Sequence, residues 1–260
     1  MIFVLMFTIL FSRITNLRTL DVSNNNLSKV DNRIGSLTGL KSFNCDGNKL
    51  SSGSLEFATK LKKLQILSAG GNKLGISITN NKNGTAHPKP LPSLEPLPAL
   101  PPSLKQLKID GNSLQSVPRS ICTSILVNLE KLDLSTNNVA CIPPEIGNLT
   151  SLIELNIDRN CIVSLPEEIG KLVKLKVLSL KSNNIDVDTT KFSPGNPQPL
   201  PSSLFTETLV IDLNLHGNKM TSKQLNEFDG FSAFLDRRHS VKSKNIYGGA
   251  LTDLDMCGLH

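Results

Sequence analysis

Apolar residues recur along most of this chain at a fixed spacing that ends in an asparagine. Between Leu129 and Ile185 the pattern occurs three times: leucine, two residues, leucine, one residue, an aliphatic residue, two residues, asparagine. These copies start at Leu129, Leu152 and Leu175, 23 residues apart. Apolar and polar side chains alternate inside each copy, as in a half-buried β-strand. The spacing therefore predicts a stack of short strands, one for each repeat.

Five further copies extend the pattern, with starts at Leu17, Leu40, Leu64, Leu104 and Val210. Counting from each start, the asparagine is position 9, where a small amide can bond the backbone groups of a turning chain. After two of the asparagines, the segments Pro143-Pro-Glu145 and Pro166-Glu-Glu168 place proline first and acids next, as at the start of a short helix. One repeat cannot bury its own leucines, so stacked neighbours must form the core.

This pattern resembles the leucine-rich-repeat signature, L-x-x-L-x-L-x-x-N-x-L with a period of 20 to 29 residues. The resemblance implies an α/β solenoid with a curved parallel β-sheet on its concave side, short helices or extended segments on its convex side, and a C-terminal helical cap. The phrasing LPxEIGxLxxL of Ile142–Leu152 and Leu165–Leu175 also resembles the intracellular Ras-group repeat proteins, including the plant and Shoc-like ones. That likeness implies a cytoplasmic scaffold or adaptor that binds another protein in signal transduction.

We expect three parts: an apolar segment or incomplete repeat at residues 1–16, an array of about eight repeats at 17–220, and a cap helix with a basic tail at 221–260. Insertions at 75–103 and 186–203 interrupt the array. The first begins as a polar loop, and both contain proline-rich, extended chain. Both should bulge from loops without breaking the stack. In the cap, Thr221 and Gln224 fit a capping box, and Phe231, Phe234 and Leu235 have helical spacing.

The amino terminus and the cysteines bear on the compartment. Met1–Phe11 is apolar, but it has no preceding basic residue and no small-residue cleavage site, so we interpret it as part of a repeat. Five scattered cysteines favour a reducing, cytoplasmic compartment, and Cys45 occupies a strand position of the core. The alternative is a secreted or membrane-tethered recognition protein, if residues 1–11 act as a signal.

No catalytic motif stands out. His216 and Asp212 could do acid–base work, but polar strand residues of a repeat protein are far more often contact residues. Cys257-x-x-His260 is half a zinc site without a second pair, and it fits a prenylation box poorly because Gly258 is not aliphatic. We expect a disordered tail there, and a protein that is no enzyme and uses no cofactor or metal.

The informative residues lie at positions 3, 5, 7 and 8, which point away from the core on the concave side. We call this side the strand face. Its acids number seven and its bases four, a net charge of −3, whereas the whole chain carries +6 with a pI of about 9.1. A phosphate backbone needs the opposite sign, and aromatic side chains for base stacking are absent, so nucleic acid is disfavoured. We expect a monomer without membrane contact that binds a protein with a basic or mixed surface. The predicted contact residues are Asp21, Ser23, Asn44, Asp46, Lys108, Asp110, Lys131, Asp133, Glu154, Asn156, Asp158, Arg159, Lys181, Asp212, Asn214 and His216.

Overall fold

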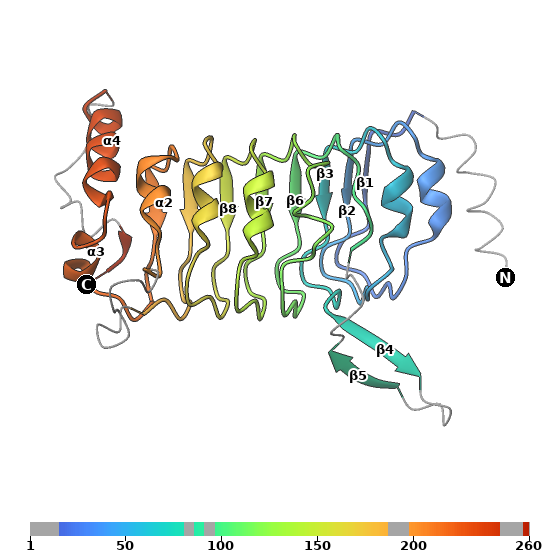
Figure 1. Ribbon diagram of the computed structural model, residues 1–260. Helices are drawn as coiled ribbons and strands as arrows, with labels where there is room; N and C mark the ends of the chain where they lie inside the picture. Colours follow the sequence, from blue (N-terminus) through green and yellow to red (C-terminus); the bar gives the residue numbers. More distant parts are fainter. Residues whose placement is uncertain (1–15, 81–85, 91–96, 187–197, 245–256, 260) are drawn as a thin grey trace. The chain divides into compact units, whose positions relative to one another are not determined.

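The computed structural model describes residues 16–80, 86–90, 97–186, 198–244 and 257–259. The chain forms two compact units: the first comprises residues 1–114 and 118–129, the second residues 115–117 and 130–260. Each unit carries four of the eight strands that the repeat pattern predicts (Figure 1). The apolar segment Met1–Phe11 lies outside the described residues, and so does the choice between a signal and part of a repeat.

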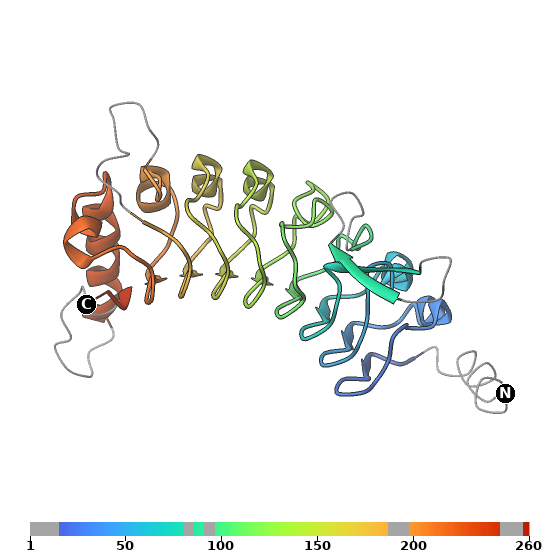
Figure 2. The same ribbon diagram turned by 90° about the horizontal axis from the view of Figure 1, so that it is seen from below.

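The first unit is built on a parallel sheet of four three-residue strands. They are β1 (Thr19–Asp21), β2 (Ser42–Asn44), β3 (Ile66–Ser68) and β6 (Gln106–Lys108), which are neighbours in that order. Two 3₁₀ helices, η1 (Asn32–Ser36) and η2 (Glu56–Lys60), lie on the side of the sheet opposite the strand face (Figure 2). The predicted arrangement of strands on one side and short helices on the other is confirmed.

The core of the first unit follows from the strand register. Phe43 pairs with Leu67 and Leu67 with Leu107, so these position-4 side chains form a column, and each is at most 2% exposed. The ring of Phe57 in η2 packs edge-on against Phe43, with centroids 4.9 Å apart. Cys45 is fully buried, so the prediction that it is a core residue is confirmed. The burial raises the pKa of its thiol to about 12.

The asparagines of position 9 tie each repeat to the one before it. Asn72 donates through Nδ2 to the carbonyls of Cys45, Ala69 and Gly70 at 3.0, 3.1 and 3.0 Å. Its Oδ1 accepts from the backbone N–H of Leu50 at 3.0 Å. One buried amide therefore satisfies four backbone groups in two repeats, and Asn48, Asn160 and Asn183 repeat the arrangement. The role expected of these asparagines is confirmed.

Position 8, directly before each asparagine, has a left-handed backbone. Its φ lies between 52° and 74° at Asn24, Gly47, Gly71, Gly111, Thr136, Arg159, Ser182 and Gly217. Glycine adopts this conformation without a steric penalty, whereas a β-branched threonine does so only under strain. The recurrence of glycine at position 8 was the available signal for this turn, which the sequence reasoning had not used.

The first insertion departs from the prediction. We expected a polar loop followed by extended chain; instead β4 (Ile76–Asn80) and β5 (Ala86–Pro90) form an antiparallel hairpin. The alternation Ile-Ser-Ile-Thr from residue 76 is a strand pattern that the sequence reasoning missed. Pro88 and Pro90 pair with Ile78 and Ile76, and prolines are tolerated here because both strands of a two-stranded sheet are edges. The array itself is unbroken, as predicted, because β3 still pairs with β6.

The second unit repeats the architecture with β7 (Lys131–Asp133), β8 (Glu154–Asn156), β9 (Val177–Ser179) and β10 (Asp212–Asn214) in parallel. Its short helices are η3 (Pro144–Asn148), η4 (Glu167–Lys171) and α2 (Ser202–Thr206). Pro143 and Pro166 are the N-cap residues of η3 and η4, with acids in the first turn, as the sequence predicted. Of the second insertion, residues 187–197 lie outside the described residues, yet β9 and β10 pair directly across it.

A helical cap follows the last strand, as expected. The capping box of Thr221 and Gln224 opens α3 (Ser222–Asn226), and α4 (Phe231–Lys244) packs on α2 through the rings of Phe205, Phe231 and Phe234. Arg237 of α4 donates to the carbonyls of Val210 and Phe205 at 3.0 and 2.9 Å. None of the helices in the described ranges has the length and apolar content needed to span a bilayer.

The end of the chain corrects the prediction of a disordered tail. Cys257 and Leu259 are 1% and 4% exposed. The N–H of Leu215 donates to the carbonyl of Cys257 at 2.8 Å, where in earlier repeats the same position donates to the next strand. The hydroxyl of Ser222 donates to the carbonyl of Leu259 at 2.8 Å. The physical reason is that β10 presents unpaired backbone groups at its edge, and Cys257–Leu259 satisfy them.

Candidate interaction surface

All sixteen predicted contact residues lie on the strand face of their own unit, and none of them is buried. Those of the first unit come from β1, β2 and β6 and the turns after them, and those of the second unit from β7 to β10. The most exposed are Asp21, Lys108, Lys131, Arg159, Asp212 and His216. Half-buried are Ser23, Asn44, Asp46, Asp110, Asp133, Glu154, Asn156, Asp158, Lys181 and Asn214. Their contacts divide them into two kinds.

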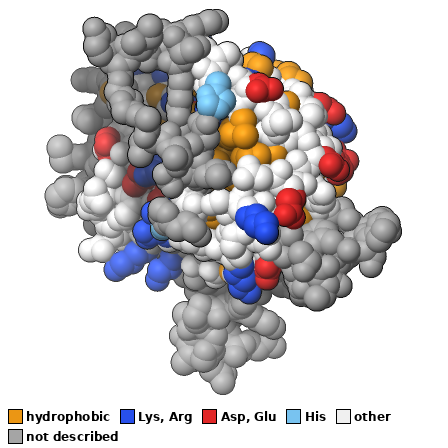
Figure 3. Space-filling model, turned by 90° about the vertical axis from the view of Figure 1, so that its left-hand side faces the viewer, with side chains coloured by type: hydrophobic (Ala, Val, Ile, Leu, Met, Phe, Trp, Pro, Cys, Tyr) orange, Lys and Arg blue, Asp and Glu red, His pale blue; other side chains and the backbone are white. Residues whose placement is uncertain are grey.

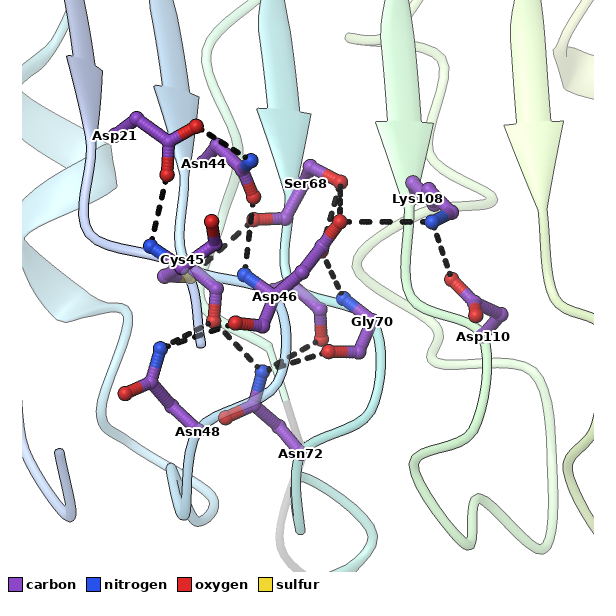
Figure 4. A network of polar contacts seen from close by, with 12 residues as sticks. Asp21, Asn44, Cys45, Asp46, Asn48, Ser68, Gly70, Asn72, Lys108 and Asp110 are labelled. Atoms are coloured by element: carbon purple, nitrogen blue, oxygen red, sulfur yellow. Dashed lines mark hydrogen bonds and ion pairs between the residues drawn. The ribbon is translucent and has the colours of Figure 1, made fainter. Parts of the chain in front are cut away.

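In the first unit, Asp46 connects neighbouring repeats (Figure 4). Its carboxylate accepts from the hydroxyl of Ser68 at 2.8 Å and from the N–H of Gly70 at 2.6 Å, both in the next repeat. On its other side lies Lys108, whose Nζ is 3.5 Å from Asp46 Oδ2 and 3.5 Å from Asp110 Oδ1. Partial burial lowers the pKa of Lys108, but the carboxylates of Asp110 and Asp46 outweigh it and raise the pKa above its ordinary value.

Asp158 has the same role in the second unit. Its Oδ1 accepts from the hydroxyl of Ser179 at 2.6 Å and from the N–H of Lys181 at 2.7 Å. Asp46 and Asp158 both occupy position 7, and their partners are positions 5 and 7 of the following repeat. These charge-assisted bonds join repeat to repeat, so the two carboxylates are already used within the chain.

The acids and amides of position 5 mostly close a local turn. Oxygen atoms of Asp21, Asn44, Asp133, Asn156 and Asn214 accept from the backbone N–H two residues later, at 2.8 to 3.1 Å. This is the Asx-turn geometry, which ends the three-residue strand. Bonds from Ser23, and then Asn44, lower the pKa of Asp21 below its ordinary value. Aspartate or asparagine at position 5 was therefore a structural signal as much as a binding one.

A smaller set of charged side chains remains for a partner. Within the described residues, the side chains of Arg159, Lys181 and Asp212 make no hydrogen bond or ion pair. Lys131 and Glu154 form an ion pair at 2.6 Å, but both side chains are more than 40% exposed, so the pair contributes little stability. Among the predicted contact residues, the charged side chains that the fold leaves unused thus lie in the second unit.

The geometry does not support the hypothesis that His216 and Asp212 act as an acid–base pair. The Nδ1 of His216 lies 2.9 Å from the carbonyl oxygen of Gly258, which it can bond only as a donor. Asp212 belongs to β10, whereas His216 lies in the turn that follows this strand. Among the described residues, no three histidine, cysteine, aspartate or glutamate side chains are grouped to hold a metal ion.

The end of the second unit that carries α3 and α4 presents acidic and basic side chains interspersed around an apolar area (Figure 3). A phosphate backbone is bound by a continuous stripe of positive charge. In this view positive and negative side chains are instead mixed, so no continuous positive stripe is seen.

Comparison with known proteins agrees with this geometry. A family model described as leucine rich repeat matches residues 128–185, and a second, described as leucine rich repeats in two copies, matches residues 15–57. These two segments are leucine-rich repeats. They include five of the eight repeat starts, and the starts at Leu64, Leu104 and Val210 fall outside them. No curated protein sequence matches the chain.

Solved leucine-rich-repeat structures share the fold. A leucine-rich-repeat protein of Leptospira interrogans aligns with a TM-score of 0.52 and 22% identity, over 83% of this chain and 54% of that one. A chain from the octameric complex of Latrophilin 3, Unc5D and FLRT2 aligns with a TM-score of 0.60 and 19% identity, over 83% and 59%. Internalin C2 of Listeria monocytogenes aligns with a TM-score of 0.58 and 20% identity, over 85% and 81%.

At these identities the likeness establishes the fold alone, an α/β leucine-rich-repeat solenoid. The chain spans little more than half the length of the first two of these proteins. Leucine-rich repeats generally mediate protein–protein interaction and are typically not enzymes, which sets the class of function to consider.

Proposed function

We propose that this chain is a non-catalytic protein-binding module that holds a protein partner on its strand face and acts as a cytoplasmic scaffold or adaptor in signalling. The observation that carries the proposal is a set of charged side chains, on or directly after successive strands of the second unit, that the fold itself does not use. They are Arg159, Lys181 and Asp212, with the exposed ion pair of Lys131 and Glu154 beside them. Charges of both signs on one face fit a partner of mixed surface.

Two further observations support parts of this proposal. All five cysteines are free thiols, which favours a reducing compartment. The complex of Latrophilin 3, Unc5D and FLRT2, one chain of which shares this fold, is an assembly of proteins. The phrasing shared with the Ras-group repeat proteins gives the proposal its signalling context.

Site-specific photo-crosslinking tests the face. A benzophenone amino acid replaces Lys131 or Asp212, both exposed on the strand face of the second unit, in protein expressed in its own cells. The matched controls carry it at Glu145 of η3 or Lys171 of η4, exposed on the helical side of the same unit. We expect specific adducts from the strand-face positions alone. Equal adducts from the helical side would show that the partner binds elsewhere.

Proximity labelling tests the compartment. The labelling enzyme is fused after His260 through a flexible linker, so that Met1–Phe11 stays free to act as a signal and Cys257–Leu259 can still pack against β10. Cytoplasmic signalling proteins among the neighbours would support the adaptor. Neighbours from the secretory pathway would instead favour a secreted or membrane-tethered recognition protein.

A further inference from the structure

The first unit carries a second charged surface, away from the strand face, at the edge where its strands begin. There a two-residue turn precedes each of β2, β3 and β6, at residues 38–39, 62–63 and 102–103, and a fourth such turn lies at residues 127–128 near the end of this unit. The same bond closes each turn, from the N–H of the first leucine to the carbonyl three residues earlier, at 2.9 to 3.1 Å. The edge lies opposite the one from which β4 and β5 project (Figure 1).

Three side-chain hydrogen bonds make this edge one continuous surface. Arg18 Nη1 donates to the carbonyl of Gly39 at 2.9 Å, and the hydroxyl of Ser103 donates to the carbonyl of Leu64 at 2.7 Å. Asn128 Nδ2 donates to the carbonyl of Pro102 at 2.9 Å. Each of these bonds spans 21 to 39 residues of sequence and joins one turn of the solenoid to the next, so the turns line up along the edge.

Five exposed cations lie along this line: Arg18, Lys41, Lys62, Lys63 and Lys105. We call these five the basic edge. Arg18 and Lys41 lie on adjacent segments of the chain. The backbone N–H of Lys41 donates to the carbonyl of Arg18 at 2.8 Å, which places the two backbone segments about 4.8 Å apart. In the described part of the chain no carboxylate pairs with Lys41, Lys62 or Lys63. Like charges side by side oppose folding, so the arrangement is stabilised when an anionic surface covers it.

Exposed aliphatic side chains lie in and just before the turn at residues 127–128, which Asn128 joins to the turn at 102–103. Val127, in the last of the four turns, is 46% exposed, and Ile125 just before it is 52% exposed. Both belong to the first unit. A basic surface bordered by exposed aliphatic side chains is the composition that lies on an anionic membrane, where the cations meet phosphates and the apolar groups enter the interface.

We propose that the basic edge docks the first unit on an anionic lipid surface. Four of the five cations are lysines, which act as hydrated point charges and need no fixed partner geometry, as suits a fluid layer of headgroups. Recognition of a protein carboxylate more often uses the planar fork of arginine. The edge carries no aromatic side chain on which a nucleic-acid base could stack. This inference goes beyond the proposed function and departs from the expectation of no membrane contact, which rested on the strand face alone.

Vesicle co-sedimentation of the full chain tests the proposal, with phosphatidylcholine vesicles that contain or lack phosphatidylserine, at about 0.1 M NaCl. The test variant is Lys62→Glu with Lys63→Glu. The control is Lys49→Glu with Lys73→Glu, the same charge change at exposed position-10 residues of the same unit, beyond the other ends of the strands. Because all four lysines are exposed, we expect native folding of both variants, checked by circular dichroism.

The wild type should bind vesicles with phosphatidylserine and not those without it. Lys62→Glu with Lys63→Glu should weaken binding at least about 25-fold, from roughly fivefold for each basic residue near an anionic surface. The control should stay within about threefold of wild type. Equal losses in the two variants, or no preference for phosphatidylserine, would overturn the proposal. If the wild type bound polyglutamate more tightly than vesicles, and Lys62→Glu with Lys63→Glu abolished that binding, the ligand of the basic edge would be an acidic protein instead. Crosslinking from the strand face tests the proposed function independently of either result.

Discussion

The position-9 asparagines give the sharpest stability prediction, and Asn72→Ala tests it. Asn72 is 6% exposed, and truncation removes four hydrogen bonds at once, one to the buried N–H of Leu50 and three to carbonyls. A buried polar group left without a partner costs about 1–3 kcal/mol. The N–H of Leu50 is orphaned outright, and the carbonyls keep part of their bonding elsewhere. We expect a loss of about 2–4 kcal/mol in the free energy of unfolding.

Asn25→Ala is the matched control, because Asn25 occupies position 9 of the first repeat but is exposed. It donates only to the carbonyls of Val22 and Ser23, within its own repeat, at 3.0 and 2.8 Å. Water can replace both bonds, so we expect a loss of about 0.5 kcal/mol or less.

Urea unfolding followed by circular dichroism measures both variants, compared at equal m-values so that a change in midpoint reports stability. Hydrogen exchange adds a local readout, since the amide of Leu50 should lose protection in Asn72→Ala and keep it in Asn25→Ala. Equal losses for the two substitutions would refute the reasoning, because burial and bonding between repeats would then not matter. A protected Leu50 amide in Asn72→Ala would refute it as well.

Three further predictions follow from the strand face and the turns. Asp158→Lys should lower the free energy of unfolding in urea by about 2 kcal/mol, because it breaks the bonds to the next repeat. Asp212→Lys should change that free energy by less than about 0.5 kcal/mol. Equal effects would contradict the structural role of Asp158. Thr136→Asn should raise stability by about 0.5–1 kcal/mol, because asparagine tolerates the left-handed φ of 54° better than a β-branched residue, and a lower urea midpoint would count against it. The bond from Arg33 holds the pKa of Asp31 at about 2, so the stability from this N-cap pair is present above about pH 4 and is lost as the pH falls towards 2. NMR titration of Asp31 should show Arg33→Ala moving that pKa back towards 3.8, and an unchanged value would exclude the pair as its cause.

The surface contacts also change how the strand face should be mutated. From sequence, Asp46 and Asp158 had the same standing as Asp212, because all three are acids at outward positions. The structure separates them, since the first two accept bonds from the following repeat and Asp212 does not. Substitutions meant to probe binding therefore belong at Arg159, Lys181 and Asp212.

The sequence by itself determined the repeat architecture. Each strand, its buried leucines and its asparagine lie within about a dozen residues, so their spacing is legible in the chain, and the capping box of Thr221 and Gln224 is equally local. The start of each repeat, the strand order and the outward positions were all predicted correctly for this reason.

The tertiary structure alone decided what those outward residues do. Ser68 and Gly70 follow Asp46 by 22 and 24 residues, and they become its neighbours only when the strands pair in register. The same holds for Cys257–Leu259 beside β10, and for the cations that neighbouring repeats bring to one edge. Such contacts form between separate turns of the solenoid. A pattern that repeats along the chain fixes which way a side chain points, and the stacking of one repeat on the next fixes what it meets.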